Sequence, residues 1–168
     1  MHRDCYIGLG SNLGDRNNYL DSALARMEAV WGVGSVRSSR YQTPPWGMSA
    51  ESPDFINQVV CFRLARDPET ILVDLLAIEA GLGRHRDAAA AGYQSRTIDL
   101  DLLAVEGIQL DSPTLTLPHP RIAMRRFVLE PLTEIAPDFK LVHDGPPVRE
   151  LLRTCPDEAP VHRIPTPA

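Results

Sequence analysis

Hydrophobic residues recur along this chain with two different spacings, one typical of strands and one typical of helices. Strands are predicted by apolar runs over residues 5–9, 55–64 and 97–105, with extended chain over residues 36–43. Residues 108–110 are expected to pair with the last of these strands through the Glu106-Gly107 turn. The strand over residues 5–9 is expected to close at Gly10.

Helices are predicted where apolar residues recur every three or four positions. The predicted helices run from Leu20 to Trp31, from Pro68 to the glycines at 81 and 83, from Arg126 to Ile135 and from Val148 to Thr154. Residues 84–95 are rich in alanine and could extend the second helix, but nearby glycines lead us to interpret them as a mobile loop. No repeat or linker divides the chain, so we expect one α+β domain over residues 1–168, frayed over residues 160–168.

Composition narrows the class of protein. With 168 residues, 43% hydrophobic and 23% charged, the chain has ordinary globular usage. Its net charge of -5 argues against a dedicated nucleic-acid binder, and no stretch approaches the ~20 apolar residues of a membrane span. The three cysteines are far apart and lack a C-x-x-C pair, which favours reduced thiols. We therefore expect a cytoplasmic protein.

A pair of carboxylates is the strongest chemical signal. Residues two apart in a strand project from the same face, so Asp99 and Asp101 are expected side by side, with Ile98, Leu100 and Leu102 facing the core. Two adjacent carboxylates repel, and Mg²⁺ prefers one or two carboxylates together with substrate phosphates. The alternative is an edge strand whose acidic face is simply solvated.

Basic residues lie on both sides of this pair in the sequence. They are Arg84, Arg86 and Arg96 before it, and His119, Arg121, Arg125 and Arg126 after it. Guanidinium groups bind phosphate bidentately, although any one of these arginines taken alone would more often be simply solvated. His119 sits between two prolines, and no histidine or cysteine at ligand spacing supports a catalytic zinc site.

Glycines and aromatic residues supply two weaker signals. The glycines over residues 8–14 are spaced G-x-G-x-x-x-G, which does not fit a dinucleotide-binding turn, and a Walker A loop lacks its Gly-Lys-Ser/Thr triplet. Trp46, Phe55 and Phe127 could stack a flat heterocycle or could be core residues.

Five segments together resemble the 6-hydroxymethyl-7,8-dihydropterin pyrophosphokinase family. They are residues 8–14 (GLGSNLG), 43–45 (TPP), 53–57 (PDFIN), 96–101 (RTIDLD) and 117–120 (LPHP), and the likeness runs from about Tyr6 to Asp138. The resemblance implies a ferredoxin-like α/β sandwich with a largely antiparallel sheet flanked by helices. It also implies transfer of pyrophosphate from ATP to 6-hydroxymethyl-7,8-dihydropterin, with release of AMP, in folate biosynthesis.

The resemblance also implies roles for individual residues. Arg84 and Arg96 match catalytic-loop arginines, and Asp99 and Asp101 match the ligands of two Mg²⁺ ions. The matches for ATP binding are His119, Arg125, Thr116 and Ile98; those for pterin binding are Thr43, Pro44, Trp46, Phe55, Asn57 and Phe127. We expect the protein to be a monomer whose partners are these two small substrates, and we expect it to bind neither nucleic acid nor a membrane.

Two departures from the family pattern, residues 92–95 (GYQS) and Leu76, are expected to affect ATP affinity and loop closure rather than the reaction. From the residues alone, two other functions stay open. One is a metal-dependent phosphohydrolase or nuclease built on the same aspartates. The other is a binding module without catalysis.

Overall fold

The computed structural model describes residues 1–49, 51–84 and 96–165. The elements in chain order are β1 (Arg3–Ser11), α1 (Arg16–Trp31), β2 (Val36–Arg37), β3 (Tyr41–Thr43), β4 (Phe55–Leu64), α2 (Pro68–Gly81), β5 (Asp99–Val105), β6 (Leu110–Asp111), β7 (Thr116–Leu117), the 3-10 helix η1 (Ile122–Met124), α3 (Arg126–Ile135), α4 (Val148–Arg153) and β8 (His162–Arg163). In this part of the chain, no helix has the length and apolarity needed to span a bilayer.

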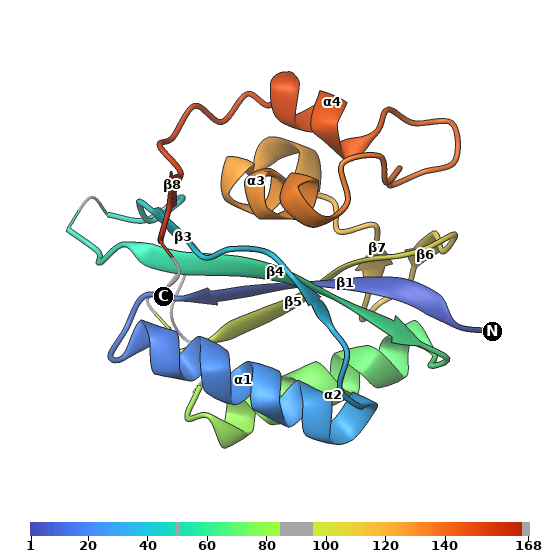
Figure 1. The fold of residues 1–168 in the computed structure, drawn as a ribbon, viewed down its shortest axis with the longest axis horizontal. Coiled ribbons are helices and arrows are strands. Elements are labelled where there is room, and N and C mark those ends of the chain that lie inside the picture. The colour runs from blue at the N-terminus through green and yellow to red at the C-terminus, as the bar shows by residue number, and fades with distance from the viewer. Residues whose placement is uncertain (50, 85–95, 166–168) are drawn as a thin grey trace.

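One antiparallel sheet forms the middle of the molecule. Its strand order is β5-β1-β4-β3-β8, and β2 pairs with β4. Helices α1 and α2 cover one face of the sheet, and α3 and α4 lie over the other (Figure 1). The β-α-β-β-α-β order with β1 and β4 in the centre is that of a ferredoxin-like fold. The expected α+β class and largely antiparallel sheet are confirmed.

Polar caps fix where the first two helices begin. The Asp15 carboxylate accepts the backbone N–H of Asn18 at 3.0 Å, and the Asp67 carboxylate accepts that of Glu69 at 2.9 Å. Each bond satisfies one of the N–H groups that a helix start leaves without an intrahelical partner. Helix α1 ends before Gly32, whose φ of 95° suits glycine far better than other residues.

Each face of the sheet carries its own hydrophobic core. On β1, Cys5, Ile7 and Leu9 face α1 and α2, and Tyr6 packs in the second core against Phe139 of the segment between α3 and α4. The next positions on the α3 side of β1 are glycines at 8 and 10, which leave this face without side chains. The α3 face of the sheet is therefore hollow at the end of β1.

Several expectations drawn from the sequence need correction. Strand β1 continues through Gly10 to Ser11, because β4 and β5 pair with it on both sides. The extended chain over residues 36–43 forms two short strands, β2 and β3, instead of one.

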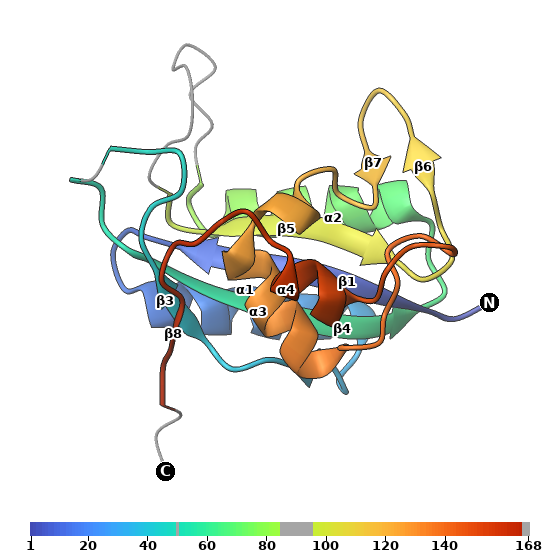
Figure 2. The same ribbon diagram turned by 90° about the horizontal axis from the view of Figure 1, so that it is seen from above.

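The pairing expected for residues 108–110 is wrong: β6 pairs with β7, because the Ser112 N–H donates to the Leu115 carbonyl and closes a separate hairpin. This hairpin projects from one end of the molecule (Figure 2). The loop expected over residues 84–95 lies outside the described residues from 85 onward.

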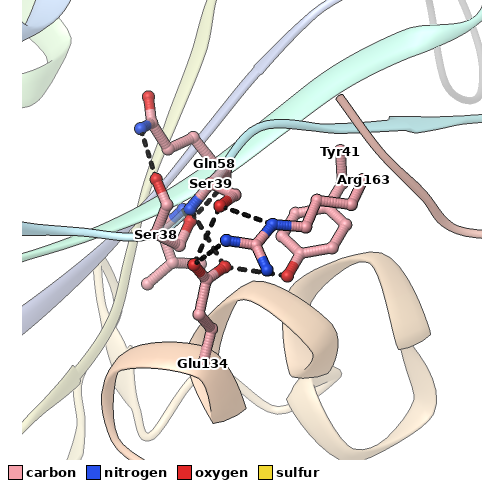
Figure 3. A network of polar contacts seen from close by, with 7 residues as sticks. Ser38, Ser39, Tyr41, Gln58, Glu134 and Arg163 are labelled. Atoms are coloured by element: carbon pink, nitrogen blue, oxygen red, sulfur yellow. Dashed lines mark hydrogen bonds and ion pairs between the residues drawn. The ribbon is translucent and has the colours of Figure 1, made fainter. Parts of the chain in front are cut away.

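The end of the chain is held by a polar network (Figure 3). Glu134, in the last turn of α3, accepts hydrogen bonds from the Ser39 N–H at 2.9 Å, the Ser39 hydroxyl at 2.8 Å and the Tyr41 hydroxyl at 2.8 Å. Arg163 donates to the same carboxylate at 3.2 Å. The frayed tail expected from residue 160 is therefore wrong for His162 and Arg163, which pair with β3. Residues 166–168 lie outside the described part of the chain.

Candidate active site

A cavity of ≈ 420 Å³ lies on the α3 side of the sheet, where β1 ends and β4 and β5 begin. It is lined by Gly8, Leu9, Gly10, Thr43, Pro44, Trp46, Phe55, Asn57, Gln58, Val59, Arg84, Arg96, Asp99, Asp101, Leu103, His119, Pro120, Arg121, Arg125, Phe127 and Val128. Twelve of the fourteen site residues expected from the sequence are among them.

Two glycines form the floor of the cavity. In the register of β1, Gly8 lies opposite Asp101 of β5, and Gly10 lies between Asp99 of β5 and Asn57 of β4. A Cβ atom on Gly10 would lie only 3.0 Å from Oδ1 of Asn57, closer than ordinary contacts allow. The absence of side chains on β1 therefore opens the space between the amide on one strand and the carboxylates on the other.

The two aspartates lie at one end of this floor. Burial raises the pKa of Asp101 to about 7, and the neighbouring Asp99 carboxylate adds to the rise. The charges of Arg125 and Arg96 offset only part of this rise, so the pair of carboxylates fits a bound divalent cation. Among the described residues no three His, Cys, Asp or Glu side chains form a metal cluster, so phosphate oxygens or water would have to complete the coordination. This is the arrangement that Mg²⁺ prefers.

Arginines hold Asp99 from two sides. Nη1 of Arg96 contacts its carboxylate at 2.9 Å, and Arg84 contacts the other oxygen of the same group. Arg84 also donates to Oε1 of Glu79 at 2.6 Å. Burial alone would lower the pKa of Arg84, but Asp99 and Glu79 outweigh burial and raise it. The Arg84 guanidinium therefore stays charged beside the aspartates.

Aromatic rings and an amide form the other end. The Arg125 guanidinium carbon lies 5.0 Å from the ring centroid of Trp46 and 5.7 Å from that of Phe127. The Arg96 guanidinium carbon lies 5.8 Å from the Phe55 centroid. Asn57 donates to the Thr43 hydroxyl at 2.7 Å. Flat faces and amide hydrogen-bonding groups are what a planar heterocycle with polar edges requires.

His119 faces this cavity in a defined tautomer. Its backbone N–H donates to the Leu103 carbonyl at 2.7 Å, and its Nδ1 accepts the backbone N–H of Arg121 at 3.2 Å. Burial lowers the pKa of His119, and the charge of Arg125 lowers it further. The imidazole is therefore neutral at pH 7, and since Nδ1 is an acceptor, Nε2 carries the proton.

Two expected site residues lie elsewhere. Thr116 is exposed on β7, where its hydroxyl donates to Asp111 at 3.3 Å. Ile98 is fully buried in the core beneath α1 and α2. Neither lines the cavity. Leu76, one of the departures from the family pattern, is 39% exposed on α2.

Other residues contribute to the site without having been singled out from the sequence. Gly8 and Gly10 open the floor of the cavity, and the signal in the sequence is that glycines two apart in a strand leave one face bare. Glu79 of α2 is 2% exposed and accepts from Arg84 and from the Leu100 N–H. Asn12, 1% exposed, bonds to Arg96 and Pro53. The sequence carries no signal for the contacts of these last two, because their partners are distant along the chain.

Comparison of the sequence with known proteins identifies the family of this chain. Residues 6–137 match the model of the family described as 7,8-dihydro-6-hydroxymethylpterin-pyrophosphokinase (HPPK). The chain is 44% identical over 148 residues to the 2-amino-4-hydroxy-6-hydroxymethyldihydropteridine pyrophosphokinase of Methylorubrum extorquens, covering 88% of this chain and 90% of that protein. It is 38% identical over 166 residues to the protein of the same name from Pseudomonas aeruginosa, covering 98% and 99%.

Solved structures agree on the fold. A crystal structure of HPPK-DHPS in complex with substrates superposes with a TM-score of 0.71 at 16% identity, covering 92% of this chain and 44% of that one. A Plasmodium falciparum HPPK-DHPS structure gives a TM-score of 0.67 at 16% identity, covering 92% and 45%. This chain thus spans less than half of those two proteins, and at this identity they support the fold alone. On the strength of its match to the family model and its curated relatives, the chain belongs to the 7,8-dihydro-6-hydroxymethylpterin-pyrophosphokinase family.

Proposed function

We propose that this protein transfers pyrophosphate from ATP to 6-hydroxymethyl-7,8-dihydropterin, giving the pterin diphosphate and AMP, in folate biosynthesis. The observation that carries the proposal is the division of one cavity into two chemically different ends. One end holds the Asp99 and Asp101 carboxylates among arginines, and the other holds aromatic rings beside an amide. Such a cavity suits two substrates that meet in the middle.

The aromatic end is proposed to bind the pterin. Phe55 and Phe127 would stack on its two faces, and Asn57, already held by Thr43, would hydrogen-bond its polar edge. Pro44 and Trp46 would close the side of this subsite. Because Asn57 is 7% exposed, its hydrogen bonds form away from competing water, where they discriminate strongly between ligands.

The charged end is proposed to bind ATP with Mg²⁺. Asp99 and Asp101 would hold the metal, two ions in the complete complex, and bound Mg²⁺ would neutralise phosphate charge and polarise the transferred group. His119, through its Nε2–H, and Arg125 would contact the nucleotide. Thr116, exposed on β7, would reach ATP only at its periphery, and Ile98, whose side chain is fully buried, would contact ATP only through its backbone.

The reaction is an in-line displacement. The pterin hydroxymethyl oxygen forms a bond to the β-phosphorus, the bond from that phosphorus to the oxygen bridging the α- and β-phosphates breaks, and AMP leaves with that oxygen. The hydroxyl proton passes to solvent. Arg84 and Arg96, which both contact Asp99, would stabilise negative charge on the transferred group.

We further propose that residues 1–168 act as one monomeric pyrophosphokinase domain in the cytoplasm, without nucleic acid or membrane as partner. The acidic net charge and the free cysteines at positions 5, 61 and 155 support this assignment. The phosphohydrolase alternative leaves the aromatic end of the cavity without a role.

The test is AMP release from ATP and Mg²⁺, with and without 6-hydroxymethyl-7,8-dihydropterin. The proposal predicts AMP only when pterin and metal are both present, and loss of that AMP in Asp99→Ala. Release of ADP or free phosphate regardless of pterin would instead establish a hydrolase. No turnover and no Mg²⁺-dependent ATP binding would reject catalysis.

A further inference from the structure

Asn12 joins two segments that line opposite ends of the cavity, although it does not line the cavity itself. It follows β1 directly, and its side chain is buried, with 1% exposed. Oδ1 accepts the backbone N–H of Arg96 at 2.8 Å, and the Asn12 N–H donates to the Arg96 carbonyl at 3.2 Å. Nδ2 donates to the Pro53 carbonyl at 3.2 Å. One side chain therefore connects residues 53 and 96.

The chemistry of these contacts explains why an amide stands here. A primary amide offers a donor and an acceptor on one planar group, and Asn12 uses the donor for a carbonyl and the acceptor for an N–H. An apolar residue of the same size would remove both of these hydrogen bonds, and with them the side-chain link between residues 53 and 96. Each segment would then lose a bond that holds it in place.

Each connected segment leads to a side chain of the site. Pro53 is two residues before Phe55, on the pterin end, and the Arg96 guanidinium contacts Asp99, on the phosphate end. The two side chains meet, because the Arg96 guanidinium carbon lies 5.8 Å from the Phe55 ring centroid. The separation of the two ends is thus fixed through Asn12, behind the cavity wall.

We propose that Asn12 is a positioning residue that sets the distance between the pterin and pyrophosphate subsites. The inference rests on the proposed function, since only a transfer between two substrates depends on that distance. Misplacing reacting groups by about 1 Å can cost about 100-fold in rate. Loss of Asn12 should therefore lower kcat through Arg96 and weaken pterin binding through the segment before Phe55.

A matched control exists on the pterin side. The Asp54 carboxylate accepts Nε2 of Gln42 at 2.9 Å, so Gln42 supports the same segment as Asn12 but has no bond to Arg96. Gln42→Leu should weaken pterin binding and leave kcat within about twofold of the parent. Leu24→Ala, in the core on the opposite face, controls for a general loss of stability.

The experiment measures kcat at saturating substrates, pterin dissociation constants by fluorescence titration, and melting temperature for Asn12→Leu, Arg96→Ala and the double variant. We expect Asn12→Leu to lower kcat by about 10- to 100-fold in the parent and by less than about twofold in the Arg96→Ala background. Asn12→Ala replaces Asn12→Leu if the latter does not fold.

Equal factors in both backgrounds, or a kcat loss that Leu24→Ala reproduces at the same melting temperature, would overturn the positioning role. Unchanged kinetics in Asn12→Leu would overturn it as well. These results are distinct from failure of the proposed function, which would already appear in the parent protein as AMP release that does not require the pterin.

Discussion

Oε1 of Glu79 accepts the backbone N–H of Leu100 at 2.7 Å, so a glutamate on α2 is bonded to β5 at the position between the two aspartates. The glutamate is 2% exposed, and the same oxygen accepts a hydrogen bond from Nη1 of Arg84.

Replacing Glu79 with alanine would leave the Leu100 N–H unpaired and remove one partner of a buried ion pair. We expect Glu79→Ala to lower the free energy of unfolding by about 3 kcal/mol. Glu79→Gln, which keeps an oxygen for Leu100, should lose less. Urea unfolding of both variants checks this, and equal losses would contradict it.

Arg96→Ala should lower turnover far more than pterin affinity. Arg96 contacts Asp99 at 2.9 Å, where charge would develop during transfer, whereas its contact with Phe55 is only a cation–π interaction at 5.8 Å. We expect kcat to fall by about 1,000-fold, as when an arginine that stabilises transferring phosphate is removed. The pterin dissociation constant should rise by less than about fivefold, since one cation–π contact contributes about 1 kcal/mol. Equal losses in both quantities would count against this role.

Asp101→Asn should abolish AMP release and yet stabilise the protein when metal is absent. Burial and Asp99 raise the pKa of Asp101 to about 7, above the value near 4 of an unfolded chain. An acid with a raised pKa makes stability fall as pH rises through that interval. The melting temperature of Asp101→Asn in EDTA should therefore exceed that of the parent most clearly above pH 7 and least at pH 4. A variant less stable than the parent at pH 8 would contradict the expectation.

Gly10→Ala should selectively weaken pterin binding. The added Cβ would lie 3.0 Å from Oδ1 of Asn57 and would displace an amide proposed to bind the pterin edge. We expect the pterin dissociation constant to rise by about tenfold, corresponding to loss of one buried hydrogen bond of about 1.4 kcal/mol. Gly8→Ala is the matched comparison, because its Cβ would meet Leu103 at 3.4 Å, an acceptable distance. A similar effect of both substitutions on pterin affinity would argue against displacement of Asn57.

Glu134→Gln should reduce the loss of stability in acid. Burial raises the pKa of Glu134, but the Tyr41 hydroxyl and the Ser39 donors outweigh burial and lower it. A lowered pKa means that this carboxylate stabilises the fold above its unfolded value of about 4.3 and that the stabilisation disappears as pH falls through the folded pKa. Unfolding free energies of parent and variant should therefore converge as pH falls from about 5 toward 3. Parallel pH profiles would contradict the prediction. Tyr41→Phe removes one donor and should give a smaller change of the same kind.

Regular elements with local signals were predictable from the sequence. The Asp67-Pro68 start of α2, the Gly32 end of α1 and the alternation of Asp99, Leu100 and Asp101 all depend on neighbouring residues, and the structure has them as expected. Pairing was harder, because the partner of a short strand depends on residues far away. Leu110 was expected beside β5 but pairs with Leu117, and His162 was expected in a frayed tail but pairs with Gln42.

The residues of the candidate site also differ in how far they could be predicted from the sequence. Side chains that belong to a recognisable segment, such as Phe55, Asn57 and His119, were predicted and line the cavity. Residues that act on the site from behind, such as Glu79 and Asn12, were not, because their bonds span 21 and 84 positions of the chain. Ile98 illustrates the opposite case, in which alternation correctly placed the side chain in the core although a nucleotide contact was also expected.

Strand β8 covers the outer edge of β3 through the register Tyr41 with Arg163 and Gln42 with His162. An uncovered edge presents free N–H and C=O groups and serves as a template for another chain. Clipping the protein before His162 would therefore do more than shorten it. The truncated chain would expose an unpaired, aggregation-prone sheet edge next to the pterin subsite. Its solubility would therefore fall before its turnover did.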